Sequence, residues 1–281
     1  MEEFGVRLRR AMDIRGPLCV GIDPHANLLS RWGLPDNPEG LATFCKATVA
    51  ALGDMAAVIK PQSAFFERYG SAGIAVLEAT IRRCREAGAL VLLDVKRGDV
   101  GPTAQAYAQT YLNPASPLYC DAITVNPYLG IGALDSIFDE ADAHRGGVFV
   151  LALTSNPEGT EIQHARTADG RTVGQYVLDE VGRRNADEQP MGSVGVVVGA
   201  TIGADTGHDL TRVNGPILAP GLGAQGAKAD DLRKIFGDVM RLVLPAYSRE
   251  ILSHGPSAPG LRGAAMGALL ACRKALEYPD L

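Results

Sequence analysis

The sequence predicts a single-domain (β/α)8 TIM barrel that spans residues 1–281. Short apolar runs alternate with longer helical patterns about eight times, and the composition does not change along the chain. Most of these runs lack polar alternation, which is typical of parallel strands covered by helices. Eight strand–helix units in a chain of this length match such a barrel, whereas an open doubly wound sheet is the alternative.

The predicted strands are short runs rich in β-branched and other apolar residues. Several of them end at a charged or glycine-containing segment, where a loop is expected to begin. They cover residues 17–23, 56–60, 89–96, 121–126, 146–155, 193–201, 216–223 and 240–247.

The predicted helices have apolar residues at a spacing of three to four. Gly88 ends one of them, as expected of a helix C-terminus. A further helix is expected before the first strand, and a polar insertion, 156–171, follows strand five. The helices between and after the strands cover residues 40–53, 71–88, 102–112, 132–144, 172–185, 206–214, 228–236 and 260–278.

Composition excludes several classes of protein. Hydrophobic residues make up 46% and charged residues 21%, which is typical of a globular chain and not of a disordered, collagen-like or coiled-coil protein. The formal net charge is −5, so no basic excess is present to bind a phosphate backbone, and nucleic acid is not an expected partner.

The expected compartment is the cytoplasm. The start of the chain lacks an apolar secretory core, and no apolar stretch approaches the ~20 residues that span a bilayer. The five cysteines are scattered without a Cys-x-x-Cys pair, which predicts neither a disulfide framework nor a zinc site.

Charged residues stand where predicted strands end, namely Asp23, Lys60, Asp94 and Lys96. In a parallel barrel the carboxyl ends of the strands and the loops after them build the active site. Alternation along strand three places Asp94 and Lys96 on one face, and Gly98 allows a turn that brings Asp99 forward. A structural ion-pair cluster is the alternative, but convergence of two cations and two anions on this rim favours catalysis.

A glycine-rich loop follows strand seven and predicts a phosphate site. Gly221, Gly223 and Gly226 let backbone N–H groups approach an anion, and the loops after strands seven and eight hold phosphate in many barrels. Arg249, just past strand eight, is suited to bind the same anion. After strand five, Ser155 offers a hydroxyl to a polar ring edge, although a capping turn explains it equally well.

No metal site is expected. The five histidines show no ligand spacing. Asp94 and Asp99 are suited to hold Mg²⁺ beside phosphate oxygens, but Lys96 between them competes for the same carboxylates.

The combination of motifs resembles the orotidine 5′-phosphate decarboxylase family. The pattern Asp94-x-Lys96-x-x-Asp99-x-x-x-Thr103 follows a strand-end Lys60 and precedes Pro220-Gly-x-Gly-Ala-Gln225-Gly. The segment 126–130 and the extra length after strand five resemble the longer bacterial branch. The likeness runs from Asp23 to Arg249.

The resemblance implies cofactor-free conversion of orotidine 5′-monophosphate to UMP and CO2 in de novo pyrimidine biosynthesis, by a homodimer. Lys60, Asp94 and Lys96 would belong to one subunit's site, with Lys96 protonating C6, and Asp99 and Thr103 would come from the other subunit. The implied substrate contacts are Asp23 and Lys60 to ribose, Ser155 to the pyrimidine, and Gly223, Gln225 and Arg249 at the phosphate. The arginine in this family usually follows Val-Gly, whereas here it follows Tyr247 and Ser248.

Three alternatives remain at this point. A Mg²⁺-dependent phosphosugar decarboxylase or synthase of the same superfamily usually has a carboxylate where Lys60 stands. A Schiff-base aldolase would use a neutral Lys60 or Lys96, whereas Lys96 is flanked by aspartates. A non-catalytic nucleotide-binding protein is the third, and turnover distinguishes it from the enzymes.

Overall fold

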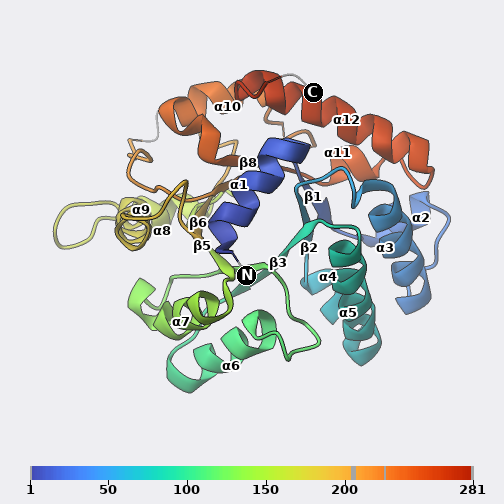
Figure 1. Ribbon diagram of the computed structural model, residues 1–281, viewed down its shortest axis with the longest axis horizontal. Coiled ribbons are helices and arrows are strands. Elements are labelled where there is room, and N and C mark those ends of the chain that lie inside the picture. The colour runs from blue at the N-terminus through green and yellow to red at the C-terminus, as the bar shows by residue number, and fades with distance from the viewer. Residues whose placement is uncertain (1, 204–206, 225, 280–281) are drawn as a thin grey trace.

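The computed structural model describes residues 2–203, 207–224 and 226–279, which form the predicted barrel. Eight parallel strands follow one another in chain order, and β1 pairs with β8 to close the ring (Figure 1). The strands are β1 (Cys19–Ile22), β2 (Val58–Pro61), β3 (Leu90–Arg97), β4 (Ala122–Val125), β5 (Gly147–Leu153), β6 (Val194–Val198), β7 (Ile217–Ala219) and β8 (Val243–Tyr247).

Helices surround the ring of strands (Figure 1). They are α1 (Phe4–Arg15), α2 (Ala26–Arg31), α3 (Pro38–Leu52), α4 (Ala64–Glu67), α5 (Gly70–Glu86), α6 (Gly101–Leu112), η1 (Ile131–Leu134), α7 (Asp135–His144), α8 (Gly159–Gln163), α9 (Val173–Arg184), α10 (Ala229–Phe236), η2 (Gly237–Leu242), α11 (Arg249–Leu252) and α12 (Ala258–Ala275). The strands β1, β2, β4, β6, β7 and β8 are buried at every residue, which explains why their sequences are apolar apart from Lys60 and Thr124.

Helix α1 closes the amino end of the barrel, where Figure 1 shows it crossing the centre of the ring. Phe4 packs edge-on against Phe149, with ring centroids 6.0 Å apart. A Cβ at Gly147 would lie 2.2 Å from the Phe4 ring, so only glycine fits beneath it. Arg7 on the same helix pairs with Asp121, Nη1 to Oδ1 2.5 Å, at the start of β4. With this end covered, the carboxyl ends of the strands are left to receive a ligand.

The helix predicted over 206–214 is wrong. The described part of that segment, 207–214, is an irregular loop. The Asp209 carboxylate accepts hydrogen bonds from the Thr211 N–H and hydroxyl at 2.8 and 2.6 Å, which is an Asx turn. Gly207 and Asn214 have positive φ, and this local bonding and geometry replace the helix.

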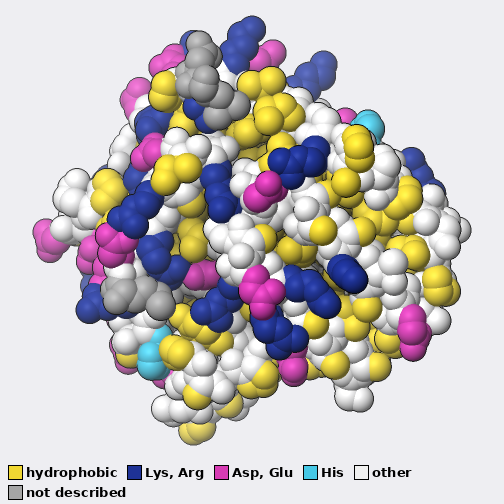
Figure 2. All heavy atoms as spheres, turned by 45° about the vertical axis from the view of Figure 1, so that its right-hand side comes forward, with side chains coloured by type: hydrophobic (Ala, Val, Ile, Leu, Met, Phe, Trp, Pro, Cys, Tyr) yellow, Lys and Arg dark blue, Asp and Glu magenta, His cyan; other side chains and the backbone are white. Residues whose placement is uncertain are grey.

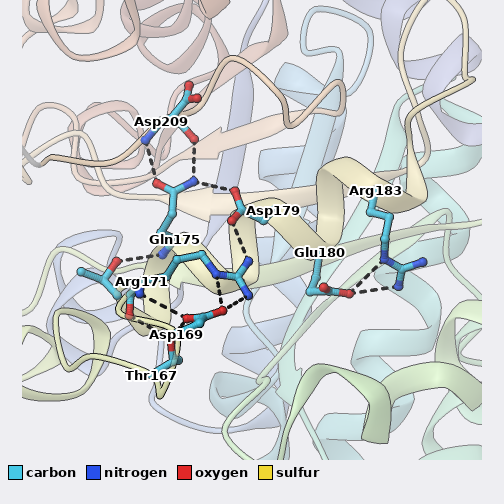
Figure 3. A network of polar contacts seen from close by, with 9 residues as sticks. Thr167, Asp169, Arg171, Gln175, Asp179, Glu180, Arg183 and Asp209 are labelled. Carbon is cyan, nitrogen blue, oxygen red and sulfur yellow. Dashed lines mark hydrogen bonds and ion pairs between the residues drawn. The ribbon is translucent and has the colours of Figure 1, made fainter.

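The insertion after β5 is tied to helix α9 by the polar network in Figure 3. Arg171 donates to Asp169 and to Asp179 at 2.6–2.9 Å. Gln175 donates to Asp179 at 2.8 Å and accepts from the Asp209 N–H at 2.7 Å. The loop after β5 and the loop between β6 and β7 are therefore both fastened to one helix.

The outer surface carries mixed charge. On the face shown in Figure 2, basic and acidic side chains lie interspersed among the residues drawn. None of the helices in the described ranges has both the length and the apolar character needed to traverse a lipid bilayer.

Candidate active site

Two adjoining cavities open at the carboxyl ends of the strands. The larger has a volume of about 290 Å³ and the smaller about 70 Å³, and Asp23, Lys60 and Pro220 line both. The other residues of the larger cavity are Gln62, Asp94, Lys96, Thr124, Leu151, Thr154, Ser155, Asn156, Val197 and Leu218. The smaller is completed by Gly21, Gly221, Leu222, Ala224, Ala246, Tyr247, Ser248 and Arg249.

An ion-pair cluster forms one wall of the larger cavity. Asp94 accepts from Lys60 Nζ through Oδ2 at 2.9 Å and from Lys96 Nζ through Oδ1 at 2.6 Å. The Asp94 and Lys60 side chains are 9% exposed, whereas Lys96 is 45% exposed and faces the open side. The structure thus brings together three of the charged groups that the sequence placed at strand ends.

Burial and charge have opposite effects on this pair. Burial alone would lower the pKa of Lys60, but the charges of Asp94 and then Asp23 outweigh it and raise that pKa. Burial alone would raise the pKa of Asp94, but Lys60 and Lys96 outweigh it and lower that pKa. Lys60 is therefore an ammonium and Asp94 a carboxylate throughout the neutral range.

Lys96 stands in a bulge of β3, since the pairing register with β4 shifts between Leu93 and Arg97. Its φ of +45° is in the left-handed region, which is uncommon for a side chain other than glycine. The sequence analysis placed Lys96 and Asp94 on one face by regular strand alternation. In the structure the two side chains do meet, but the strand between them is bulged and not regular.

Thr124 of β4 is a residue of the cavity that sequence reasoning missed. It is 1% exposed, and its hydroxyl donates to Asp94 Oδ1 at 2.8 Å. The only signal in the sequence is a hydroxyl inside the otherwise apolar run of β4, 122–125. Because threonine is also a common strand residue, that signal does not point to a site.

The loop after β5 places Ser155 in the larger cavity. A Cβ at Gly199 would lie 3.0 Å from the Ser155 backbone N, so the glycine that follows β6 lets this loop approach closely. Gln163 of α8 accepts from the Thr154 N–H at 2.9 Å and donates to the Thr154 hydroxyl at 2.7 Å. The insertion therefore fixes the residue beside Ser155.

The smaller cavity contains buried polar atoms whose hydrogen-bonding capacity is unsatisfied. Asp23 Oδ1 and Ser248 Oγ are buried, and neither has a hydrogen-bond partner among the described residues. Both lie near Gly21, where a Cβ would be 2.9 Å from the Ser248 Cβ. Arg249 lines the same cavity. A buried acceptor, a buried hydroxyl and a guanidinium suit a ligand with hydroxyl and phosphate groups.

The glycine-rich loop borders this cavity unevenly. Gly221 and Ala224 line it, but Gly223 does not. The Gly223 N–H donates to the Ala227 carbonyl at 2.9 Å, and its φ is +70°. In this structure Gly223 shapes the loop, and its N–H is already occupied. Gln225 lies outside the described residues.

Asp99 and Thr103 do not line either cavity. The Asp99 carboxylate accepts from the Val100 N–H at 2.8 Å, and Thr103 is exposed on α6. Gly98 lies against the loop after β4, because a Cβ there would be 2.3 Å from the Asn126 carbonyl oxygen. One chain therefore brings Lys60, Asp94 and Lys96 together and leaves Asp99 apart.

Within residues 2–203, 207–224 and 226–279, no group of three or more His, Cys, Asp or Glu side chains is arranged to hold a metal ion. Both oxygens of Asp94 are bonded to lysines.

Comparison with known proteins identifies close relatives. The profile of the family described as "Orotidine 5'-phosphate decarboxylase / HUMPS family" matches residues 16–258. A protein from Salinispora arenicola named orotidine 5′-phosphate decarboxylase is 66% identical over 276 residues, covering 98% of this chain and 99% of its own. One of that name from Streptomyces coelicolor is 57% identical over 265 residues, covering 94% and 95%.

Solved structures agree with this relationship. A crystal structure named for orotidine 5′-phosphate decarboxylase of Streptomyces avermitilis is 55% identical, with a TM-score of 0.96, and covers 99% of this chain and 97% of its own. The OMP decarboxylase of Leishmania donovani is 29% identical, with a TM-score of 0.77, and covers 98% and 99%.

Proposed function

Because this chain belongs to the orotidine 5′-phosphate decarboxylase / HUMPS family, we propose that it converts orotidine 5′-monophosphate to UMP and CO2 in pyrimidine biosynthesis. One observation carries the proposal. An exposed lysine, Lys96, is held 2.6 Å from a buried carboxylate, Asp94, which a second lysine, Lys60, neutralises on its other oxygen.

The reaction needs a cation at the carbon that loses CO2. When the bond between C6 and the carboxylate breaks, its electron pair stays on C6. The Lys96 ammonium stabilises this developing charge and then donates its proton to C6, leaving a neutral amine that takes a proton from water. The position of Lys96 at the open side of the cluster suits this role.

Asp94 has two functions in this proposal. It holds Lys96 by a charge-assisted hydrogen bond, and its charge favours the ammonium form of Lys60. It also repels the substrate carboxylate, and this repulsion falls as CO2 leaves and its charge passes to the ring. Lys60 keeps Asp94 ionised at a site where burial opposes the charge.

The smaller cavity is suited to the ribose phosphate. Asp23 Oδ1 offers an acceptor to a ribose hydroxyl, and Lys60 beside it offers a donor. Arg249 and Gln225 are assigned to the phosphate, beside a loop that Gly223 shapes. In the larger cavity, Ser155 is assigned to the pyrimidine edge. Binding energy from the phosphate, far from C6, orders the substrate for the chemical step.

The proposed enzyme is a homodimer in which Asp99 and Thr103 complete the partner's site. These two residues lie outside the cavities of their own chain. Val100, next to Asp99, is 55% exposed, and the loop after β4, which Gly98 contacts at Asn126, exposes Tyr128 at 73% and Leu129 at 54%. Exposed apolar groups around polar site residues are suited to contact a second copy.

A cytoplasmic location is also proposed. All five cysteines are free and buried, as is usual for a protein kept in a reducing compartment. The Mg²⁺-dependent alternative has no support here. Lys60 is a cation bonded to Asp94, at the position where enzymes of that kind usually have a carboxylate.

An ultraviolet assay with orotidine 5′-monophosphate in the presence of EDTA tests the proposal. We expect the substrate absorbance to fall at the same rate with and without chelator, with UMP as the product. Loss of activity in EDTA that Mg²⁺ restores would favour the metal-dependent reaction. Binding of UMP without turnover would favour a nucleotide-binding protein.

A further inference from the structure

One hydroxyl group on β4, that of Thr124, bonds to three successive residues of β3. The Thr124 hydroxyl donates to Asp94 Oδ1 at 2.8 Å and accepts from the backbone N–H groups of Val95 at 3.1 Å and Lys96 at 2.9 Å. A hydroxyl has one proton to donate and two lone pairs to accept with, so all of its capacity is used.

The bulge in β3 explains why a side chain is needed there. Between Leu93 and Arg97 the strand leaves its register with β4, so neither Val95 nor Lys96 is paired with a residue of β4 in the regular ladder. Thr124 supplies the acceptor that the ladder would otherwise provide. It therefore supports the left-handed conformation of Lys96, whose φ is +45°.

The same hydroxyl also orients the acid. Asp94 Oδ1 receives both the Thr124 hydroxyl and Lys96 Nζ, while Oδ2 receives Lys60. Thr124 thus fixes the backbone from which the Lys96 side chain starts and the oxygen on which its ammonium rests.

We propose that Thr124 is a positioning residue for decarboxylation, acting through Asp94 and Lys96. The proposal rests on the function proposed above and deepens it. When both the backbone and the ammonium of Lys96 are fixed, its charge and its proton are directed at C6. Displacement of the ammonium should lower kcat and leave substrate affinity unchanged.

The test compares T124V, which keeps the shape and removes the hydroxyl, with T124S, which keeps the hydroxyl. Thr48 provides the matched control, because it is a fully buried threonine on α3 whose hydroxyl has no partner among the described residues. We expect T124V to lower kcat about 10- to 100-fold, as for loss of hydrogen bonds to a charged group, with KM within about threefold. T124S and T48V should stay within about threefold of the unsubstituted enzyme in both constants.

Three results would overturn the role of Thr124: unchanged kcat in T124V, a change confined to KM, or a T124S variant as slow as T124V. If T124V does not fold, T124A with T48A as its control gives the same comparison. No turnover by the unsubstituted protein would instead overturn the proposed function, which separates the two claims.

Discussion

Lys60 Nζ and Asp94 Oδ2 lie 2.9 Å apart on neighbouring strands, and each side chain is only 9% exposed. Removing one member of such a buried pair leaves a charge with less compensation. We expect K60M to lower the free energy of unfolding by about 3 kcal/mol, the lower end of the usual range, because Lys96 still contacts Asp94. Urea unfolding measures this change, and activity should fall with it.

The double variant K60M/D94L provides the control for that prediction. With both charges replaced by apolar groups, most of the lost stability should return, whereas activity should not recover. A double variant less stable than K60M would contradict the interpretation that the uncompensated carboxylate causes the loss.

The pH dependence of stability should follow from the same pair. The pKa of Asp94 is lowered on folding, so its contribution is present above the usual pKa of about 4 and is lost as pH falls below it. The pKa of Lys60 is raised, so its contribution is present below the usual pKa of about 10.4 and is lost as pH rises above it. Between about pH 5 and 9 the contribution of the pair should be constant.

K60M should change this profile at its acid end. Without Lys60, burial raises the pKa of Asp94 relative to the unsubstituted protein, so the folded variant takes up a proton more readily as pH falls. Protonation removes the uncompensated charge, and the difference in stability between K60M and the unsubstituted protein should therefore shrink as pH falls from 8 to 4. Urea midpoints from pH 4 to 8 measure the difference. Parallel curves for the two proteins would contradict the prediction.

Lys96 and Arg249 should affect different kinetic constants. K96A removes the cation and the proton donor, so we expect kcat to fall at least about 1,000-fold. R249A removes a phosphate contact, so we expect KM to rise about 10- to 100-fold with a smaller change in kcat. R233A, an exposed arginine paired with Glu277, is the control and should match the unsubstituted enzyme. Similar small effects of K96A and R249A would contradict the assigned roles.

Mixing two inactive variants tests the shared site. D99A lacks the residue that each subunit contributes to the site of the other subunit. K96A lacks the residue that each subunit contributes to its own site. After subunit exchange, half of the dimers contain one of each, and one of the two sites in such a dimer is intact. Recovery of about a quarter of the unsubstituted activity is therefore expected. No recovery, with exchange confirmed by mass spectrometry of the dimers, would mean that each site is complete within one chain.

The cysteines should be unreactive in the folded protein. Burial raises the pKa of Cys19, Cys45 and Cys272 to about 12, and it also raises the pKa of Cys84 and Cys120. Because the thiolate is the reactive form, Ellman's reagent at pH 8 should label none of the five until guanidinium unfolds the chain. Fast labelling of the native protein would show that a cysteine is accessible.

The barrel could be predicted because its strands are buried on both sides and its main helices are long enough to show their period. The helices α2, α4, α8 and α11 have four to six residues and were missed, because one turn shows no periodicity. The predicted helix over 206–214 was wrong because apolar spacing does not reveal the local bonding of Asp209.

The site was partly predictable for a related reason. The rule that strands end at the active site located Lys60, Asp94 and Lys96, since a charge at the end of an apolar run is conspicuous. Thr124 was not predictable, because its role depends on a bulge whose backbone angles leave no trace in the residue pattern. The unsatisfied hydroxyl of Ser248 was likewise not predictable, because its burial depends on the pairing of β1 with β8, which the sequence does not show directly.

Helix α1 covers one mouth of the barrel, with Phe4 wedged against Gly147, while both cavities open at the other. If the enzyme is immobilised on a support through the start of α1, its cavities should accordingly open toward the solution, because the attachment point lies at the opposite end of the barrel. Fusion partners and affinity tags placed there leave the route of substrate and product unobstructed.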